Sequence, residues 1–196
     1  MRAKILLATL LVCATVIAQD KPAAKKMEMD PAMMEAMMKA AMPGPAHKAL
    51  DGMVGSWDTK VTSWMMPGGD PMTSAGTSEN KWVMGGRYVE QRFKGDMMGM
   101  PFEGLGYSGY DNVKKQYFGT WIDNMSTGMM TSVGTGGDAK TMHFKGTYAD
   151  PMTGKDVTCD EKVTMVDADH MIFEMWGPGP DGKNFKMMEI AYSRKK

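Results

Sequence analysis

The chain has 196 residues and a balanced charge, with 23 Lys and Arg against 23 Asp and Glu. This length suits one domain with a sizeable core. A balanced charge provides no concentrated basic surface, so nucleic acid is excluded as an expected partner. Methionine is the compositional outlier at 26 residues. Its thioether side chain fills irregular gaps, suits adaptable surfaces and is a soft ligand for Cu(I).

Residues 1–18 have the pattern of a secretory signal peptide. Arg2 and Lys4 precede an apolar run that ends in small residues before a predicted cleavage at Gln19. The run is too short to span a bilayer comfortably. We therefore expect an exported protein, periplasmic or secreted, with no stable membrane insertion after cleavage. Cleavage removes two basic residues and no acidic ones, which leaves a net charge of −2, and Cys159 is then the only cysteine, so no intramolecular disulfide can form.

A helical N-terminal arm is expected at residues 30–53, after a short charged linker at 19–29. Asp30 suits the N-cap and Pro31 the first position of a helix that runs to Met42, where a Pro-Gly-Pro sequence ends it. The methionines of this helix spread over an apolar face that is wider than a single docking stripe. We expect the rest of the protein to leave part of that face uncovered.

The hydrophobic period changes from helical to alternating at residues 54–196, and turn sequences rich in Gly, Pro and Asp recur at short spacing. About ten strands are expected, at 56–66, 73–84, 87–95, the two arms of a hairpin within 102–123, 127–135, 141–148, 157–166, 171–176 and 185–193. Such a meander favours closure into a barrel, because closure removes exposed strand edges. The predicted fold is all-β, an antiparallel up-and-down barrel with a short helical N-terminal arm.

The hairpin within 102–123 has aromatic residues on both arms and a polar tip at 111–115. Side chains at alternate positions of a closed barrel line its interior. We expect aromatic side chains to form flat apolar walls and a few charged side chains to orient a ligand. The ligand-binding candidates are Trp82, Arg87, Tyr88, Arg92, Tyr107, Tyr117, Trp121 and Asp123. A second interpretation of Arg87 and Asp123 stays open, in which they sit at strand ends and close the barrel mouths.

The sequence Gly55-Ser56-Trp57, after a short helical turn and at the head of the first expected strand, resembles the calycin superfamily of lipocalins, fatty-acid-binding proteins and relatives. In that superfamily the Trp closes one end of the barrel, and in lipocalins it often stacks on an Arg from the last strand. The resemblance implies that Trp57 and Arg194 close the barrel here. Arg194 shares strand parity with Ile190 and Tyr192.

Further short sequences fall in order along the chain. They are Pro43-Gly44 with His47 and Leu50, Gly85-Gly86-Arg87, Phe102-Glu103-Gly104, Gly109-Tyr110-Asp111, Thr120-Trp121-Ile122-Asp123, Asp181-Gly182-Lys183 and Tyr192-Ser193-Arg194. Together with Gly55-Ser56-Trp57 they resemble the bacterial family called domain of unknown function 1579, mostly exported proteins, over residues 30–195. The family has no assigned reaction, so the resemblance implies a calycin-like barrel and no particular activity.

No sequence motif of catalysis or cofactor binding stands out. His47, His143 and His170 lie in separate segments without metal-ligand spacing, and neither a Gly-x-Ser-x-Gly nor a Cys-His motif occurs. We therefore expect no catalytic residue and no cofactor. The leading hypothesis is an exported, non-enzymatic barrel protein that binds a small, largely apolar organic molecule.

Two alternatives stay open. The first is a Met-rich copper-handling protein that acts through its N-terminal arm, with ligands among Met27, Met29, Met33, Met34, Met37 and Met38. The second is an enzyme of unrecognised type, which would need a convergent set of Asp, Arg and Tyr in the cavity. The oligomeric state is open as well.

Overall fold

The computed structural model of the protein describes residues 30–138 and 140–196. The predicted signal peptide at 1–18 and linker at 19–29 lie outside the described residues. The helical elements are α1 (Pro31–Ala41), α2 (Pro45–Lys48) and the 3-10 helix η1 (Asp51–Met53). The strands are β1 (Gly55–Ser63), β2 (Met72–Val83), β3 (Tyr88–Met97), β4 (Met100–Asp111), β5 (Gln116–Asp123), β6 (Met130–Gly137), β7 (Thr141–Ala149), β8 (Asp156–Met165), β9 (His170–Pro178) and β10 (Asn184–Arg194).

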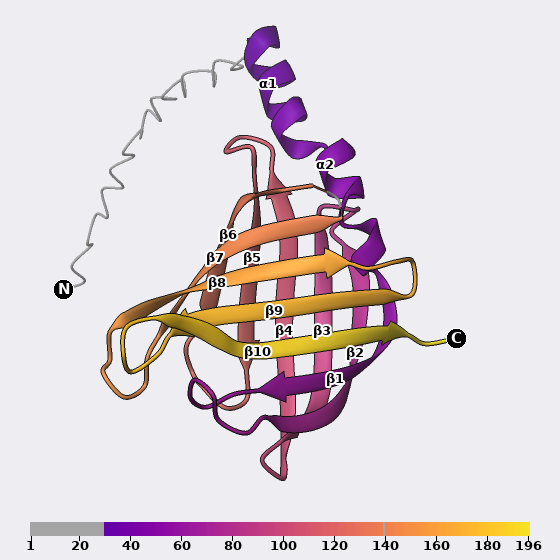
Figure 1. Ribbon diagram of the computed structural model, residues 1–196. Helices are drawn as coiled ribbons and strands as arrows, with labels where there is room; N and C mark the ends of the chain where they lie inside the picture. The colour runs from indigo at the N-terminus through magenta and orange to yellow at the C-terminus, as the bar shows by residue number, and fades with distance from the viewer. Residues whose placement is uncertain (1–29, 139) are drawn as a thin grey trace, which may run out of the picture.

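The ten strands of this described part close into one antiparallel barrel, in the order β1-β10-β9-β8-β7-β6-β5-β4-β3-β2 (Figure 1). Each strand pairs with its neighbours in sequence, and β1 pairs with β10 to complete the ring. The predicted all-β up-and-down barrel with a helical N-terminal arm is confirmed.

The register defines the inner face of the barrel. Trp57, Ser78, Phe93, Gly104 and Asp123 lie opposite one another on consecutive strands and therefore share one face of the sheet. Trp57 is completely buried, so this face is the interior. Side chains two residues away along each strand also point inward, and those one residue away point outward.

The meander places the strand connections alternately at two ends of the barrel. The connections β2–β3, β4–β5, β6–β7 and β8–β9 share one end with α2 and η1, which lead into β1 (Figure 1). We call this the covered end. The connections β1–β2, β3–β4, β5–β6, β7–β8 and β9–β10 lie at the opposite end, which we call the open end because none of the described helices lies there.

The segment formed by α2 and η1, which we call the covering segment, fills the covered end. Leu50 is 1% exposed and packs with Val89 and Met142. The carbonyl oxygen of Met53 accepts hydrogen bonds from Trp57 Nε1 at 3.0 Å and from an inward-facing Asn80. A core of apolar side chains surrounds these contacts, including Val163, Met171 and Tyr192. The half of the barrel next to α2 is therefore a packed hydrophobic core.

Helix α1 projects from the covered end without a buried residue (Figure 1). Asp30 caps its first turn by accepting a hydrogen bond from the Ala32 amide at 3.0 Å, as Asp at an N-cap does. At its C-terminal end the side-chain amide of Asn112, in the β4–β5 hairpin, donates to the carbonyls of Ala40 at 3.1 Å and Met42 at 2.8 Å. None of the described helices is long and apolar enough to cross a membrane.

Candidate functional site

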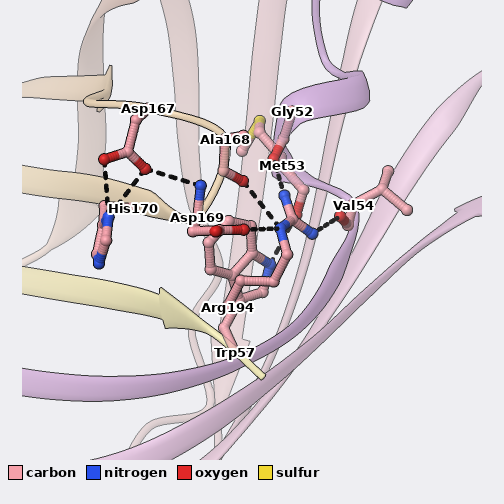
Figure 2. A network of polar contacts seen from close by, with 9 residues as sticks. All are labelled: Gly52, Met53, Val54, Trp57, Asp167, Ala168, Asp169, His170 and Arg194. Atoms are coloured by element: carbon pink, nitrogen blue, oxygen red, sulfur yellow. Dashed lines mark hydrogen bonds and ion pairs between the residues drawn. The ribbon is translucent and has the colours of Figure 1, made fainter. Parts of the chain in front are cut away.

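Arg194 joins the last strand to the covering segment at the covered end (Figure 2). Its guanidinium carbon lies 4.1 Å from the ring centroid of Trp57. The guanidinium donates to the carbonyls of Val54 at 2.7 Å and Gly52 at 3.1 Å, and its Nε donates to the carbonyl of Ala168 at 2.9 Å. The structure thus brings together the two residues predicted to close the barrel. We call this set of contacts the Arg194 clamp.

The β8–β9 turn beside the clamp is held by its own hydrogen bonds (Figure 2). Asp167 accepts from the Asp169 amide and lies 2.8 Å from His170 Nδ1. The hydrogen bond from His170 lowers the pKa of Asp167. His170 is exposed. The turn supplies the Ala168 carbonyl to the clamp, so its part in the clamp is structural.

Trp82 and Tyr117, two of the predicted ligand-binding residues, point into the barrel at the covered end. The Trp82 Nε1 group donates to Asp51 Oδ1 at 2.9 Å, and the Tyr117 hydroxyl donates to the carbonyl of Ala46 at 3.0 Å. Both side chains pack beside the Leu50 core. They anchor the covering segment to the sheet.

Tyr88, Arg92 and Tyr107 point outward, and the prediction that they line the interior is wrong. Tyr107 lies opposite Thr120, one residue away from the inward-facing pair Gly106 and Trp121. Parity along one strand is fixed by the sequence, but the phase between two strands depends on the connecting turn. A slip of one residue in that turn moves a whole strand to the other face.

Arg92 and Tyr107 instead cover an acidic side chain on the outer face of the sheet. Glu90 is only 7% exposed, and its carboxylate accepts hydrogen bonds from Arg92 Nε at 2.8 Å and the Tyr107 hydroxyl at 3.0 Å. Lys81 adds an ammonium group at 3.5 Å. The Arg92 hydrogen bond is the largest cause that lowers the pKa of Glu90.

Arg87 and Tyr88 border a hollow on the outside of the barrel, between the end of α1 and the sheet. Its volume is about 390 Å³, and it is lined by Ala40, Ala41, His47, Arg87, Tyr88, Tyr110, Asp111, Asn112 and Phe118. Arg87 donates to the Met84 carbonyl in its own turn. Tyr88 and Phe118 belong to the outer face of the sheet, whereas Tyr110 has the inward parity of Gly104, so the hollow lies at the edge of the covered end.

Trp121 and Asp123 are the predicted residues that do line the open half of the interior. The Trp121 ring lies against the backbone of Gly104, where a side chain would collide with it. It stacks on Phe102 with ring centroids 6.5 Å apart and an interplanar angle of 18°. Its Nε1 group donates to Asp123 Oδ2 at 3.1 Å. These rings form a flat aromatic wall that ends in a carboxylate.

Across from this wall the inward-facing side chains of the open half are less buried than those of the covered end. Inward-facing side chains there are only half-buried although the sheet surrounds them, namely Val61, Trp121, Met130, Tyr148, Met175 and Met188. A Cβ added to the inward-facing Gly119 would meet its nearest atom, in Ser132, at 3.6 Å, which is an ordinary contact distance. The interior of the open half is therefore less closely packed than the covered end, and we call it the open-half cavity.

A chain of polar side chains lies inside the barrel toward the covered end. Gln91 Nε2 donates to Ser78 Oγ at 3.1 Å and to the Tyr192 hydroxyl at 3.2 Å. Ser78 in turn donates to Asn80. Burial raises the pKa of Tyr192 to about 12. These groups satisfy one another and form part of the fixed scaffold.

Strand β8 places two further groups inside the barrel that sequence reasoning missed. Cys159 and Glu161 are 1% and 7% exposed. Burial raises the pKa of both side chains, that of Cys159 to about 12. The run Asp160-Glu161-Lys162 has the composition of a solvated face, but Glu161 alternates with Cys159 and Val163, and that alternation was the available signal.

Exposed methionines surround the open end. They lie in the connections and strand ends of that end, at Met65, Met66, Met72, Met97, Met98, Met100, Met125, Met129 and Met152. Because thioether side chains are apolar and adaptable, this methionine rim gives the open-half cavity an apolar surrounding.

The model of the family described as "Protein of unknown function (DUF1579)" matches residues 42–194. The chain belongs to the DUF1579 family. The matched region begins after α1 and contains the covering segment, all ten described strands and the Arg194 clamp. No curated protein matches the chain.

Two solved structures show the same fold as this DUF1579 protein at low sequence identity. The crystal structure of Rv2717c from M. tuberculosis has a TM-score of 0.60 at 15% identity, and the match covers 79% of this chain and 100% of that one. The S-type phycobiliprotein lyase CPES from Guillardia theta has a TM-score of 0.52 at 10% identity, over 82% of this chain and 97% of that one. At these identities the likeness establishes the barrel fold and leaves the function to the site itself.

Proposed function

We propose that this DUF1579 protein is an exported, non-enzymatic carrier that binds a small, largely apolar organic molecule in the open-half cavity. The observation that carries the proposal is the set of half-buried aromatic, methionine and branched side chains that point into a closed barrel. Removing such surface from water yields about 25 cal/mol per Å², so an apolar occupant would be stabilised there.

The fold supports a binding role because small antiparallel barrels enclose a space wide enough for one small ligand. A protein of the same fold is named a phycobiliprotein lyase, so the scaffold itself is compatible with more than one function. Export is proposed from the signal-peptide pattern of residues 1–18.

Binding is favoured over catalysis because the Cys159 thiol inside the barrel is held in its unreactive, protonated form. A thiol reacts as the thiolate, and burial raises the pKa of Cys159 to about 12. Its sulfur lies against the backbone of Gly146. Cys159 is therefore held as a neutral core side chain at neutral pH.

Titration with the uncharged dye Nile red tests the proposal. We expect the protein to bind the dye with a rise in fluorescence, and Trp121→Ala to weaken this binding about tenfold because an aromatic wall is lost. Trp176→Ala is the matched control, since Trp176 is an outward-facing tryptophan beneath Lys186. Gly119→Leu, which adds an inward-facing side chain beside Ser132, should block the dye while the variant still melts cooperatively. Equal dye affinity in all four proteins would contradict the proposal.

A second candidate function is soft-metal binding by α1, and the exposure of its methionines favours it. Met33, Met34, Met37 and Met38 are 49–60% exposed on a helix without buried residues, while Met27 and Met29 lie outside the described residues. Thioethers suit Cu(I). Titration with Cu(I) under reducing conditions decides the matter, because binding no stronger than that of a variant lacking residues 19–42 would remove this candidate.

A further inference from the structure

Most charged side chains of the described strands, acidic and basic, lie on the outer face of the barrel. The basic residues Lys60, Lys81, Arg92, Lys94, Lys145, Lys162 and Lys186 all occupy outward-facing positions. Several of them form ion pairs there, such as Lys186 with Glu174 at 2.7 Å. The inward-facing charges of these strands are Asp123, Glu161 and Arg194.

Arg194 is not available to a molecule in the open-half cavity. Its guanidinium is bonded to the carbonyls of Gly52, Val54 and Ala168 and lies over Trp57. Trp57 is completely buried in the packed core of the covered end. The cavity therefore has two acidic side chains on its walls and no free cation from the described strands.

Glu161 is the deeper of these two acids. It lies opposite Phe144 on β7 and Met175 on β9, which are both half-buried inward-facing side chains. Its Oε1 atom and a methyl group of Met130 both lie against Gly146, where a larger residue would displace them. The Ser132 hydroxyl is its polar neighbour, and burial outweighs that contact and raises the pKa of the carboxyl group. A carboxylate in apolar surroundings is stabilised by a cation or by further hydrogen-bond donors.

Acidic residues also outnumber basic residues at the open end of the barrel. Its connections and adjoining strand ends carry Asp70, Asp96, Asp123, Asp150, Asp156 and Asp181 against Lys155 and Lys183. An excess of one sign of charge at a barrel end raises the local concentration of the opposite sign. A cation would thus be attracted to the open end of the barrel.

We infer that the ligand of the open-half cavity is an organic amine, with its ammonium group at the Glu161 carboxylate and its apolar body against the Trp121 wall. This inference rests on the proposed function. It assigns the ligand class by charge and separates the protein from barrels that hold fatty acids, because a ligand carboxylate would meet Asp123 and Glu161 without a compensating cation. The methionine rim provides the apolar surface along which such a molecule reaches the interior.

Three ligands that share one alkyl chain test the inference, namely dodecylamine, dodecanol and dodecanoate, each used below its micelle concentration to displace Nile red. We expect dodecylamine to bind at least about tenfold more tightly than dodecanoate, since one charge-assisted hydrogen bond is worth a factor of this size. Glu161→Gln, nearly equal in shape, should reduce the preference for dodecylamine over dodecanol about tenfold and leave dodecanol affinity unchanged.

Glu90→Gln is the matched control, because Glu90 is equally buried at 7% exposure but lies on the outer face. It should leave the order of the three ligands as in the unaltered protein. Dodecanoate binding as tight as dodecylamine binding, or a preference that survives Glu161→Gln, overturns the amine assignment while Nile red binding upholds the carrier. Failure of the dye and of all three ligands to bind overturns the carrier and the amine assignment together.

Discussion

Two acidic residues with the same exposure, Glu161 inside the barrel and Glu90 outside it, contribute to stability with opposite dependence on pH. Burial raises the pKa of Glu161 above its ordinary 4.5. The contribution of Glu161 to the stability of the folded protein is therefore most favourable below pH 4.5 and is lost as pH rises through the raised pKa. The hydrogen bond from Arg92 lowers the pKa of Glu90. Its contribution is present above 4.5 and is lost as pH falls through the lowered pKa.

Thermal melts between about pH 4 and pH 8 check these signs. Glu161→Gln should melt at a higher temperature than the unaltered protein at pH 8, because it removes an unfavourable buried charge, and the difference should shrink toward pH 4. Glu90→Gln should melt at a lower temperature at pH 8, with a difference that also shrinks in acid. Two variants that shift the melting temperature in the same direction at pH 8 would show that Glu161 has a compensating partner.

At the scale of elements, the side-chain hydrogen bonds that join α1 to the barrel within the described residues come from Asn112. Helix ends leave carbonyl groups without partners, and Asn112 supplies donors to those of Lys39, Ala40 and Met42. The helix has no buried residue of its own. Within the described residues, we therefore expect the amide of Asn112 at the tip of the β4–β5 hairpin to hold the helix in place.

Asn112→Ala should release α1 and leave the barrel intact. We expect the amides of α1 to exchange with solvent about tenfold faster, since local opening becomes less costly, while the melting temperature of the barrel changes by no more than a degree or two. Asn124→Ala is the matched control, because Asn124 bonds to Pro101 at the opposite end. Unchanged exchange in α1 would mean that other contacts hold the helix.

The strand order was predictable from the sequence, but the phase between strands was not. Alternation and turn residues located ten strands, and Gly55-Ser56-Trp57 located the clamp, because both signals are local. Tyr107 was assigned to the wrong face because the β4–β5 register, with Tyr110 opposite Tyr117, depends on how the residues between them turn. Glu161 was missed for a related reason, since a charged residue signals solvent unless the pairing of its strand is known.

At the scale of the whole molecule, closure of the ring depends on the β1–β10 pair and on the Arg194 clamp. The planar guanidinium donates in three directions to carbonyls that would otherwise lack this partner. A lysine ammonium has neither the reach of this fork nor its planar face for Trp57.

Arg194→Lys should lower the free energy of unfolding by about 2 kcal/mol, through lost hydrogen bonds to a charged donor and a lost cation–π contact. Arg92→Lys is the control, because its arginine is exposed and an ammonium can still pair with Glu90. Urea unfolding at neutral pH provides the measurement. Equal losses for the two variants would show that the clamp contributes no more than a surface ion pair.

The clamp also has a consequence for the order of events in folding. The other strand pairs join neighbours along the chain, whereas the bond from Arg194 to Val54 joins residues 140 positions apart. A contact across so long a loop carries a large entropy of closure, so we expect it to form after the rate-limiting step. Contacts that form late govern the rate of unfolding more than the rate of folding. Arg194→Lys should therefore raise the unfolding rates in a chevron plot and leave the refolding rates unchanged. The arginine of the last strand would then determine how long the closed barrel persists before it unfolds.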